Sequence, residues 1–125
     1  MENKVIYPEE SYQIIGKCME VHRELGHGFL EIVYKDALEY LFRKSNIFYE
    51  REKEYEVFFQ DIILPHKFYA DFVVFDKIIL EIKAVNDLKN EHIAQTINYL
   101  KVSGNNLGLL VNFGRSSIES KRILL

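Results

Sequence analysis

Apolar side chains recur at helical spacing in two runs at the start of the chain. The first run follows Pro8–Ser11, where a proline and two acids are typical of a first helical turn. Its repeating positions are Tyr12, Ile15, Cys18, Met19, His22 and Leu25. A second run begins after the break at Gly26–Gly28, and its positions are Leu30, Val33, Tyr34, Ala37, Leu38, Leu41 and Phe42. The pattern predicts two amphipathic helices, and Glu31 lies beside the apolar stripe of the second one.

The middle of the chain changes to a period of two, which is typical of strands. Charged and apolar residues alternate over residues 49–59, which predicts a strand exposed in its first half and buried at residues 57–59. A turn is expected at Gln60-Asp61. The segment Phe68–Lys83 is rich in Phe, Val and Ile, so it predicts two strands joined by a turn at Asp76-Lys77.

The C-terminal part of the chain adds one helix and one or two strands. A helix is predicted from Leu88 to Val102, with Gly104 as its stop signal. Leu107–Phe113 is a near-continuous apolar run, which indicates a strand covered on both faces. Residues 117–124 can form an edge strand. The predicted fold class is α/β (α+β), in the order α-α-β-β-β-α-β with or without a final β, as a single domain spanning residues 1–125.

Composition and charge limit the classes of function. The 125 residues are 48% apolar and 28% charged, which are ordinary values for a folded soluble protein. No apolar run approaches the ~18 residues of a membrane span, and the first residues lack the apolar core of a signal peptide. The single cysteine, Cys18, excludes an intrachain disulfide, so we expect a cytoplasmic protein that does not bind membranes. The net charge of −3 argues against a domain that holds nucleic acid by bulk positive charge.

Apart from the turn at Asp76-Lys77, three charged residues interrupt the apolar segment 68–83: Asp71, Glu81 and Lys83. A buried charge is costly unless it is paired or binds a metal. Side chains two apart on a strand share a face, so Glu81 and Lys83 point to the same side. Two carboxylates and an amine at one place suit a Mg²⁺-dependent attack of water on a phosphodiester. A surface ion pair on an edge hairpin explains the three residues equally well.

The convergence of these groups depends on the register of the hairpin. A two-residue loop at Asp76-Lys77 would pair Asp71 with Ile82, and Asp71 would then face away from Glu81. A three-residue loop formed by Phe75–Lys77, or a bulge, would bring the two carboxylates to one face. The metal-site hypothesis therefore requires one of these two features.

The third predicted helix carries a polar pair. Gln95 and Tyr99 lie four residues apart and so share one helix face. If this helix packs beside the charged face of the sheet, an amide and a phenol overlook Asp71, Glu81 and Lys83. The alternative is a tyrosine packed at the helix edge with an incidental glutamine.

Taken together, these segments resemble a known family. Asp71 followed by Glu81-Ile82-Lys83 is similar to the core signature of the PD-(D/E)XK nuclease superfamily, with Ala70 in place of the usual proline. Gln95–Tyr99 resembles the Q-x-x-x-Y element of its RecB-like members. Gly28–Tyr34 is similar to the G-x-x-E-x-x-Y motif that names the GxxExxY family within that superfamily. Two further segments look like the C-terminal part of that family: Asn112–Gly114 and Lys121–Ile123.

The resemblance implies a restriction-endonuclease-like core, in which helices flank a mixed central β-sheet. It also implies roles for individual residues. Metal ligands for Mg²⁺ or Mn²⁺ would be Asp71, Glu81 and the backbone carbonyl of Ile82. The catalytic residues would be Lys83, Gln95 and Glu31, and the residue that contacts the substrate would be Tyr99.

The implied function is a divalent-metal-dependent nuclease that acts on DNA or RNA, with DNA preferred. One alternative is a catalytically inert nuclease-fold module that binds or assembles with other molecules. A hydrolase of small phosphate esters is disfavoured because the sequence has no Gly-rich phosphate loop. A small acidic domain needs additional basic surface to hold nucleic acid, so we expect a homodimer or a partner protein near Lys121-Arg122.

The convergent carboxylates also imply a strained site when no metal is bound, because neighbouring negative charges repel. On this reasoning, Asp71→Asn is expected to raise the Tm of the metal-free protein and to remove its response to a divalent cation.

Overall fold

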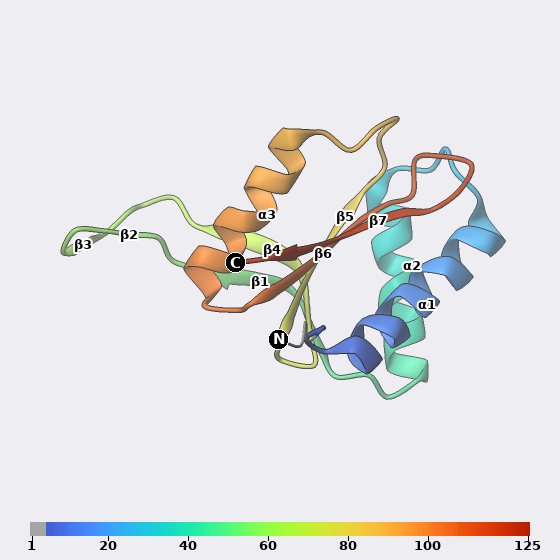
Figure 1. Cartoon of the computed structure of the whole chain (residues 1–125), viewed down its shortest axis with the longest axis horizontal. Coiled ribbons are helices and arrows are strands. Elements are labelled where there is room, and N and C mark those ends of the chain that lie inside the picture. Colours follow the sequence, from blue (N-terminus) through green and yellow to red (C-terminus); the bar gives the residue numbers. More distant parts are fainter. Residues whose placement is uncertain (1–4) are drawn as a thin grey trace.

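A five-stranded sheet forms the centre of the fold, and helices cover both of its faces (Figure 1). The computed structural model describes residues 5–125. The helices are α1 (Pro8–Leu25), α2 (Glu31–Lys44) and α3 (Asn90–Ser103). The strands are β1 (Tyr49–Tyr55), β2 (Phe58–Phe59), β3 (Ile62–Ile63), β4 (Phe68–Val74), β5 (Ile78–Lys83), β6 (Leu107–Asn112) and β7 (Glu119–Leu124). The predicted order is confirmed, with a short β2–β3 pair inserted after the first strand and the final strand present.

The strands of the sheet lie in the order β1-β4-β5-β6-β7. All neighbours are antiparallel except β5 and β6, which run parallel. Parallel neighbours need a crossover connection, and α3 supplies it. The sheet is therefore mixed, as predicted, and β5 with its charged residues lies at its centre.

Alternate side chains of the sheet enter two separate cores. The core against α1 and α2 includes Ile14, Cys18, Tyr34, Leu38, Phe42, Phe72, Leu80, Leu109 and Val111. The core against α3 includes Val73, Ile79, Leu100, Leu110 and Ile123. All residues of β6 are buried, which confirms the prediction of a strand covered on both faces. The apolar alternation therefore fixes which side of the sheet each helix covers.

The β4–β5 hairpin has the register that the metal-site hypothesis requires. Val74 is opposite Ile78, so the loop consists of the three residues Phe75–Lys77 and not of a two-residue turn at Asp76-Lys77. Phe75 and Asp76 both adopt left-handed backbone conformations with φ of 57°, which lets the chain reverse within three residues. Continuing this register places Asp71 opposite Glu81, on the same face.

The buried face of α1 differs from the predicted stripe. Its buried residues are Ser11, Ile14, Cys18 and Val21. Tyr12 is 82% exposed, so the prediction was wrong for this position. The helix carries apolar residues on two overlapping stripes. Arg122 of β7 donates hydrogen bonds to Ser11 Oγ (2.7 Å) and to the carbonyl of Ile6 (2.7 Å), and these bonds hold the Ser11 side of the helix inward.

Among residues 5–125, no helix combines the length and apolarity needed to cross a membrane.

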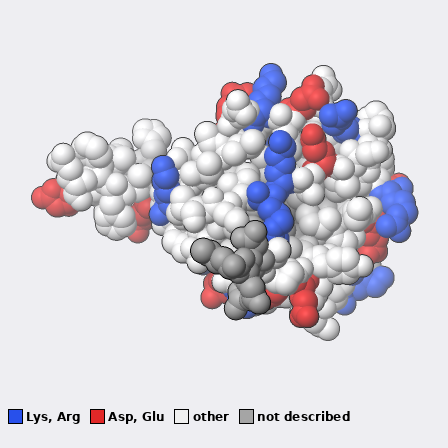
Figure 2. All heavy atoms as spheres, in the orientation of Figure 1, with Lys and Arg blue, Asp and Glu red and all other residues white. Residues whose placement is uncertain are grey.

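Residues 57–64, which we call the arm, project from the body of the molecule (Figure 1). The arm contains β2 and β3, and in Figure 2 its surface is almost free of charged side chains apart from an acidic tip. Phe58 and Phe59 are 69% and 57% exposed, so the prediction that residues 57–59 are buried was wrong. The reason is that β1 ends at Tyr55 and its partner β4 begins at Phe68, so the intervening residues have no sheet neighbour except each other.

The exposure of the arm leads to a stability prediction. The double substitution Phe58→Ser/Phe59→Ser should change the free energy of unfolding by less than about 1 kcal/mol, because little apolar surface is buried there. Phe42→Leu, in the core against α2, serves as the control and should cost about 1 kcal/mol or more. Chemical denaturation measures both. A loss in the double variant larger than that of Phe42→Leu would show that the arm is packed in solution.

Candidate active site

The carboxylates of Asp71 and Glu81 occupy the place where β4 and β5 separate. Regular pairing of the two strands ends at Phe72 and Leu80. Beyond that point, the backbone N–H of Ile82 donates to Asp71 Oδ2 (2.8 Å), and the N–H of Asp71 donates to Glu81 Oε2 (2.9 Å). Asp71 and Glu81 are 8% and 2% exposed. Two acidic side chains are therefore built into the sheet by hydrogen bonds that replace backbone pairing.

Burial has a strong effect on Glu81. It raises the pKa of the Glu81 carboxyl well above its usual range, and the negative charge of Asp71 raises it further. The hydrogen bond from the Asp71 N–H and the charges of Lys83 and Lys35 offset part of this effect. Glu81 is therefore a site that favours a proton or an added cation.

Glu31, the first residue of α2, lies at the same place. Burial raises the pKa of the Glu31 carboxyl, and the next largest cause is the charge of Asp71, which raises it further. The charges of Lys83 and Lys35 act in the opposite direction. The half-buried Glu31 carboxyl is therefore close enough to Asp71, Lys83 and Lys35 for their charges to affect its pKa. Its place in the first turn of α2 also favours a negative charge.

Lys83 and Gln95 meet directly. Lys83 lies at the end of β5, and its Nζ donates to Gln95 Oε1 of α3 at 3.1 Å. α3 packs on the face of the sheet that contains Ile79 and Leu110, which is the face that Glu81 shares with Ile79. The glutamine thus holds the ammonium group at the end of the strand.

Tyr99 lies one helical turn after Gln95 and packs at the helix edge. Its ring stacks on Phe68, with ring centroids 4.5 Å apart and an angle of 7° between the planes. Burial raises the pKa of Tyr99 to about 12, and the charges of Glu81 and Asp71 contribute to the rise. Tyr99 therefore presents a neutral hydroxyl group near the carboxylates, while Phe68 covers one face of its ring.

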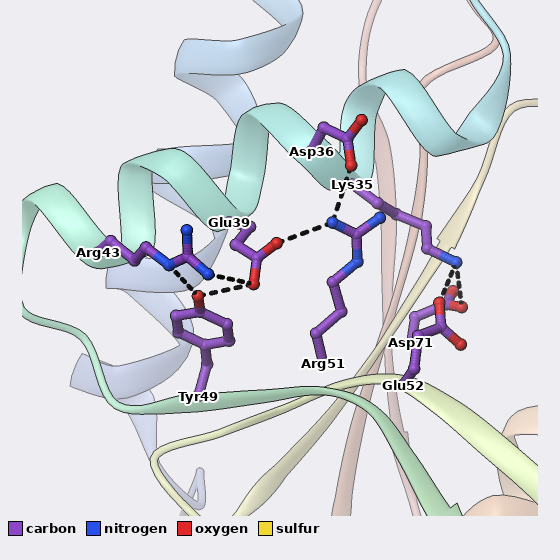
Figure 3. A network of polar contacts seen from close by, with 8 residues as sticks. All are labelled: Lys35, Asp36, Glu39, Arg43, Tyr49, Arg51, Glu52 and Asp71. Carbon is purple, nitrogen blue, oxygen red and sulfur yellow. Dashed lines mark hydrogen bonds and ion pairs between the residues drawn. The ribbon is translucent and has the colours of Figure 1, made fainter.

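Lys35 and Glu52 also belong to this cluster, although neither was predicted from the sequence. Lys35 Nζ lies 3.0 Å from Asp71 Oδ1 and 2.7 Å from Glu52 Oε1 (Figure 3). A signal for Lys35 was present, because it follows Glu31 by four residues and so shares its helix face. Glu52 gave no comparable signal, since it alternates with other charged residues along β1.

The donor chemistry of the site suits a hard divalent cation. Buried carboxylate oxygens are the ligands that Mg²⁺ and Mn²⁺ prefer, and Asp71 and Glu81 present them from adjacent strands. Within the described residues, 5–125, no group of three or more His, Cys, Asp and Glu is already arranged around a metal position. An ammonium group, that of Lys35, contacts Asp71 instead. The residues therefore fit a divalent cation chemically, while their present arrangement is stabilised by lysine.

Comparison with known proteins identifies the superfamily and supports the fold. The family model described as the PD-(D/E)XK nuclease superfamily matches residues 8–123. The chain belongs to this superfamily. A solved structure, "Crystal structure of SSO0001", is similar with a TM-score of 0.60 and 21% identity, over 94% of this chain and 59% of that chain. That likeness shows the fold, and this chain spans 59% of the length of that protein. No curated protein matches.

In this PD-(D/E)XK chain, Tyr34 positions the start of α2. Its hydroxyl donates to the carbonyl of Gly26 (2.7 Å) and accepts from the N–H of Phe29 (3.3 Å). Gly28, between them, has a φ of 108°, which favours glycine. The Tyr34 ring also stacks on Phe113, with centroids 4.6 Å apart. These contacts fix the loop before α2 and so the position from which Glu31 extends.

Asn112–Gly114 fixes the end of β5. The side chain of Asn112 bonds both backbone groups of Val85, accepting from its N–H and donating to its carbonyl, each at 2.9 Å. The N–H of Phe113 donates to the carbonyl of Lys83 (2.8 Å). A Cβ at Gly114 would lie 2.2 Å from the carbonyl oxygen of Val85, so only glycine allows this approach. The segment therefore holds the backbone from which Lys83 projects.

Proposed function

We propose that the chain is a divalent-metal-dependent nuclease that hydrolyses phosphodiester bonds in DNA or RNA, and that it belongs to the GxxExxY group of the superfamily. The observation that carries the proposal is the pair of buried carboxylates, Asp71 and Glu81, with Lys83 held by Gln95 beside them. Membership of a nuclease superfamily supports it.

The proposed cation ligands are Asp71, Glu81 and the backbone carbonyl of Ile82, and Glu31, whose pKa is raised in part by the charge of Asp71, is proposed to assist them. Mg²⁺ or Mn²⁺, when bound, would supply an activated water and compensate the negative charge that develops on the phosphate. The chain's own contribution is to hold the carboxylates in place through the backbone N–H groups of Ile82 and Asp71. Such preorganisation avoids rearrangement of the ligands during the reaction.

Lys83 is proposed to orient the attacking water or to stabilise the developing negative charge. Its side chain is only partly buried, so its ammonium group can reach a bound phosphate. Gln95 accepts a hydrogen bond from Lys83 and thereby limits the positions of the ammonium group. Tyr99 offers a neutral hydroxyl that can donate to the phosphate backbone of the substrate.

The alternative, a catalytically inert binding or assembly module, is less consistent with these contacts. A module without catalysis has no need of a lysine and a glutamine arranged together beside buried carboxylates. The exposed apolar arm is the one feature that favours an assembly role. The two roles are compatible, because the arm lies outside the carboxylate cluster.

We propose DNA in preference to RNA as the substrate, and the cytoplasm as the location. We also propose that a homodimer or a protein partner supplies additional basic surface. The guanidinium group of Arg122 donates to Ser11 and to the carbonyl of Ile6, which are both neutral, so it keeps its positive charge at the surface. Lys121, next to it, is exposed. Cys18 is a buried free thiol, which is compatible with a reducing compartment.

A cleavage assay tests the proposal. The protein is incubated with Mn²⁺ or Mg²⁺ and with end-labelled single-stranded DNA, double-stranded DNA and RNA, each with an EDTA control. We expect metal-dependent cleavage of at least one substrate. Absence of cleavage of all three by folded protein, in the presence of either metal, would favour the inert module.

A further inference from the structure

Lys35 occupies the position of a counter-cation in the carboxylate cluster. Its side chain is 10% exposed, and its Nζ bridges Asp71 Oδ1 (3.0 Å) and Glu52 Oε1 (2.7 Å). Figure 3 shows the lysine extending from α2 to the two acids on β1 and β4. An ammonium group so placed balances negative charge that would otherwise be buried without a partner.

The backbone around Glu52 is adapted to this contact. Glu52 has a φ of 53°, a left-handed conformation that is unfavourable for a residue other than glycine. The pairing of β1 with β4 passes from Arg51–Phe72 to Lys53–Ala70 and omits Glu52 and Asp71. The strain therefore coincides with the point at which the Glu52 side chain bonds Lys35. This combination indicates that the Glu52–Lys35 contact is a built feature of the site.

Lys35 and a divalent cation would compete for the same acceptor. The proposed ligand Asp71 gives Oδ2 to the backbone N–H of Ile82 and Oδ1 to Lys35, so each of its oxygens already accepts a hydrogen bond. A cation that binds Asp71 must therefore displace Lys35 or lie close to its positive charge, which repels it. The side chain of Glu52 is 46% exposed, and its ion pair with Lys35 can persist when a metal ion binds Asp71.

We propose that Lys35 is an internal counter-cation that competes with the divalent metal for Asp71, and that Glu52 holds Lys35 when the metal binds. The inference depends on the proposed metal site. Its consequence is that, at low metal concentration, Lys35 neutralises the charge of Asp71, and that the affinity for the metal depends on the displacement of this lysine.

The two partners of this ion pair should have opposite effects on metal affinity. Lys35→Met removes the competitor, so the Kd for Mn²⁺ should fall by about tenfold or more. Glu52→Gln removes the group that receives Lys35, so the Kd should rise by about tenfold. Isothermal titration calorimetry with MnCl₂ on the purified protein measures both, and no nucleic acid or cleavage is needed. Thermal unfolding in EDTA checks that each variant is folded.

Arg51→Met is the matched control. Arg51 also bridges β1 and α2, through Asp36 (2.8 Å) and Glu39 (2.9 Å), but it does not contact Asp71 (Figure 3). This variant should lose stability and keep the wild-type Kd for Mn²⁺. If Lys35→Met does not fold, Lys35→Gln replaces it, and Glu52→Gln still tests the second half of the inference.

Each outcome has a distinct meaning. If the wild type binds Mn²⁺ and the Lys35 variant binds it equally or more weakly, the inference is overturned while the metal site remains. A tighter Kd in Glu52→Gln would also overturn it. If neither the wild type nor the Lys35 variant binds Mn²⁺, both the inference and the proposed metal-dependent function fail.

Discussion

Lys83→Met should lower the rate of phosphodiester cleavage by about 100-fold or more while leaving the fold intact. Methionine keeps the unbranched side chain and removes the ammonium group. The loss of one preorganised catalytic group typically costs about 10²-fold or more. Lysine is not among the proposed metal ligands, so the Kd for Mn²⁺ should not rise. Single-turnover cleavage and calorimetry measure the two quantities.

Two variants make this experiment specific. Lys17→Met, on α1, removes a lysine whose ion-pair partner is Glu20 on the same helix, and should leave cleavage unchanged. Gln95→Leu removes the acceptor that positions Lys83, so it should lower the rate by a smaller factor than Lys83→Met. Cleavage by Lys83→Met at the wild-type rate would exclude Lys83 from the mechanism.

The sheet and the position of the carboxylates could be predicted from the sequence because they depend on local patterns. The alternation of the two strands puts Asp71 and Glu81 on the same face if the loop between the strands has an odd number of residues. The structure has such a loop, the three residues Phe75–Lys77. The four-residue spacing of Gln95 and Tyr99 likewise placed both on one helix face, and the packing of α3 brings that face to the site. Both inferences used periodicities of the backbone that tertiary contacts do not change.

Other features depended on contacts between distant segments and could not be predicted. Lys35 lies one position after a buried tyrosine, and its burial follows only from its contacts with Glu52 and Asp71. Residues 57–64 have the composition of a buried strand, yet they project because no strand of the sheet is available to pair with them. In each case the decisive partner lies on another element of the fold.

Lys35 also determines which carboxylate has a buried charge without a counter-charge. From the sequence, Asp71→Asn was expected to raise the Tm of the metal-free protein. In the structure, Asp71 accepts hydrogen bonds from the ammonium of Lys35 and from the N–H of Ile82. Glu81 is more deeply buried, and Lys83 donates to Gln95. The uncompensated charge therefore belongs to Glu81.

Glu81→Gln and Asp71→Asn should consequently shift metal-free stability in opposite directions. In EDTA near pH 8, Glu81→Gln should raise the free energy of unfolding by about 1–3 kcal/mol, because it removes a buried charge and keeps an oxygen that can accept from the Asp71 N–H. Asp71→Asn should lower it by about 1–3 kcal/mol, because Lys35 loses a charged acceptor. For a chain of this length, each kcal/mol corresponds to a change of about 4 °C in Tm.

The pH dependence separates this explanation from a general packing effect. Because the pKa of Glu81 is raised by burial, the folded protein binds a proton there more tightly than the unfolded chain does. The contribution of Glu81 to the stability of the metal-free wild type should therefore fall as pH rises from about 4.3, the ordinary value for glutamate, through the raised pKa, and then become constant. Glu81→Gln lacks this group, so its advantage over the wild type should grow across the same range. Thermal unfolding in EDTA at a series of pH values measures the difference in stability between Glu81→Gln and the wild type. If this difference stays the same at all pH values, Glu81 is not the carboxylate with the uncompensated charge.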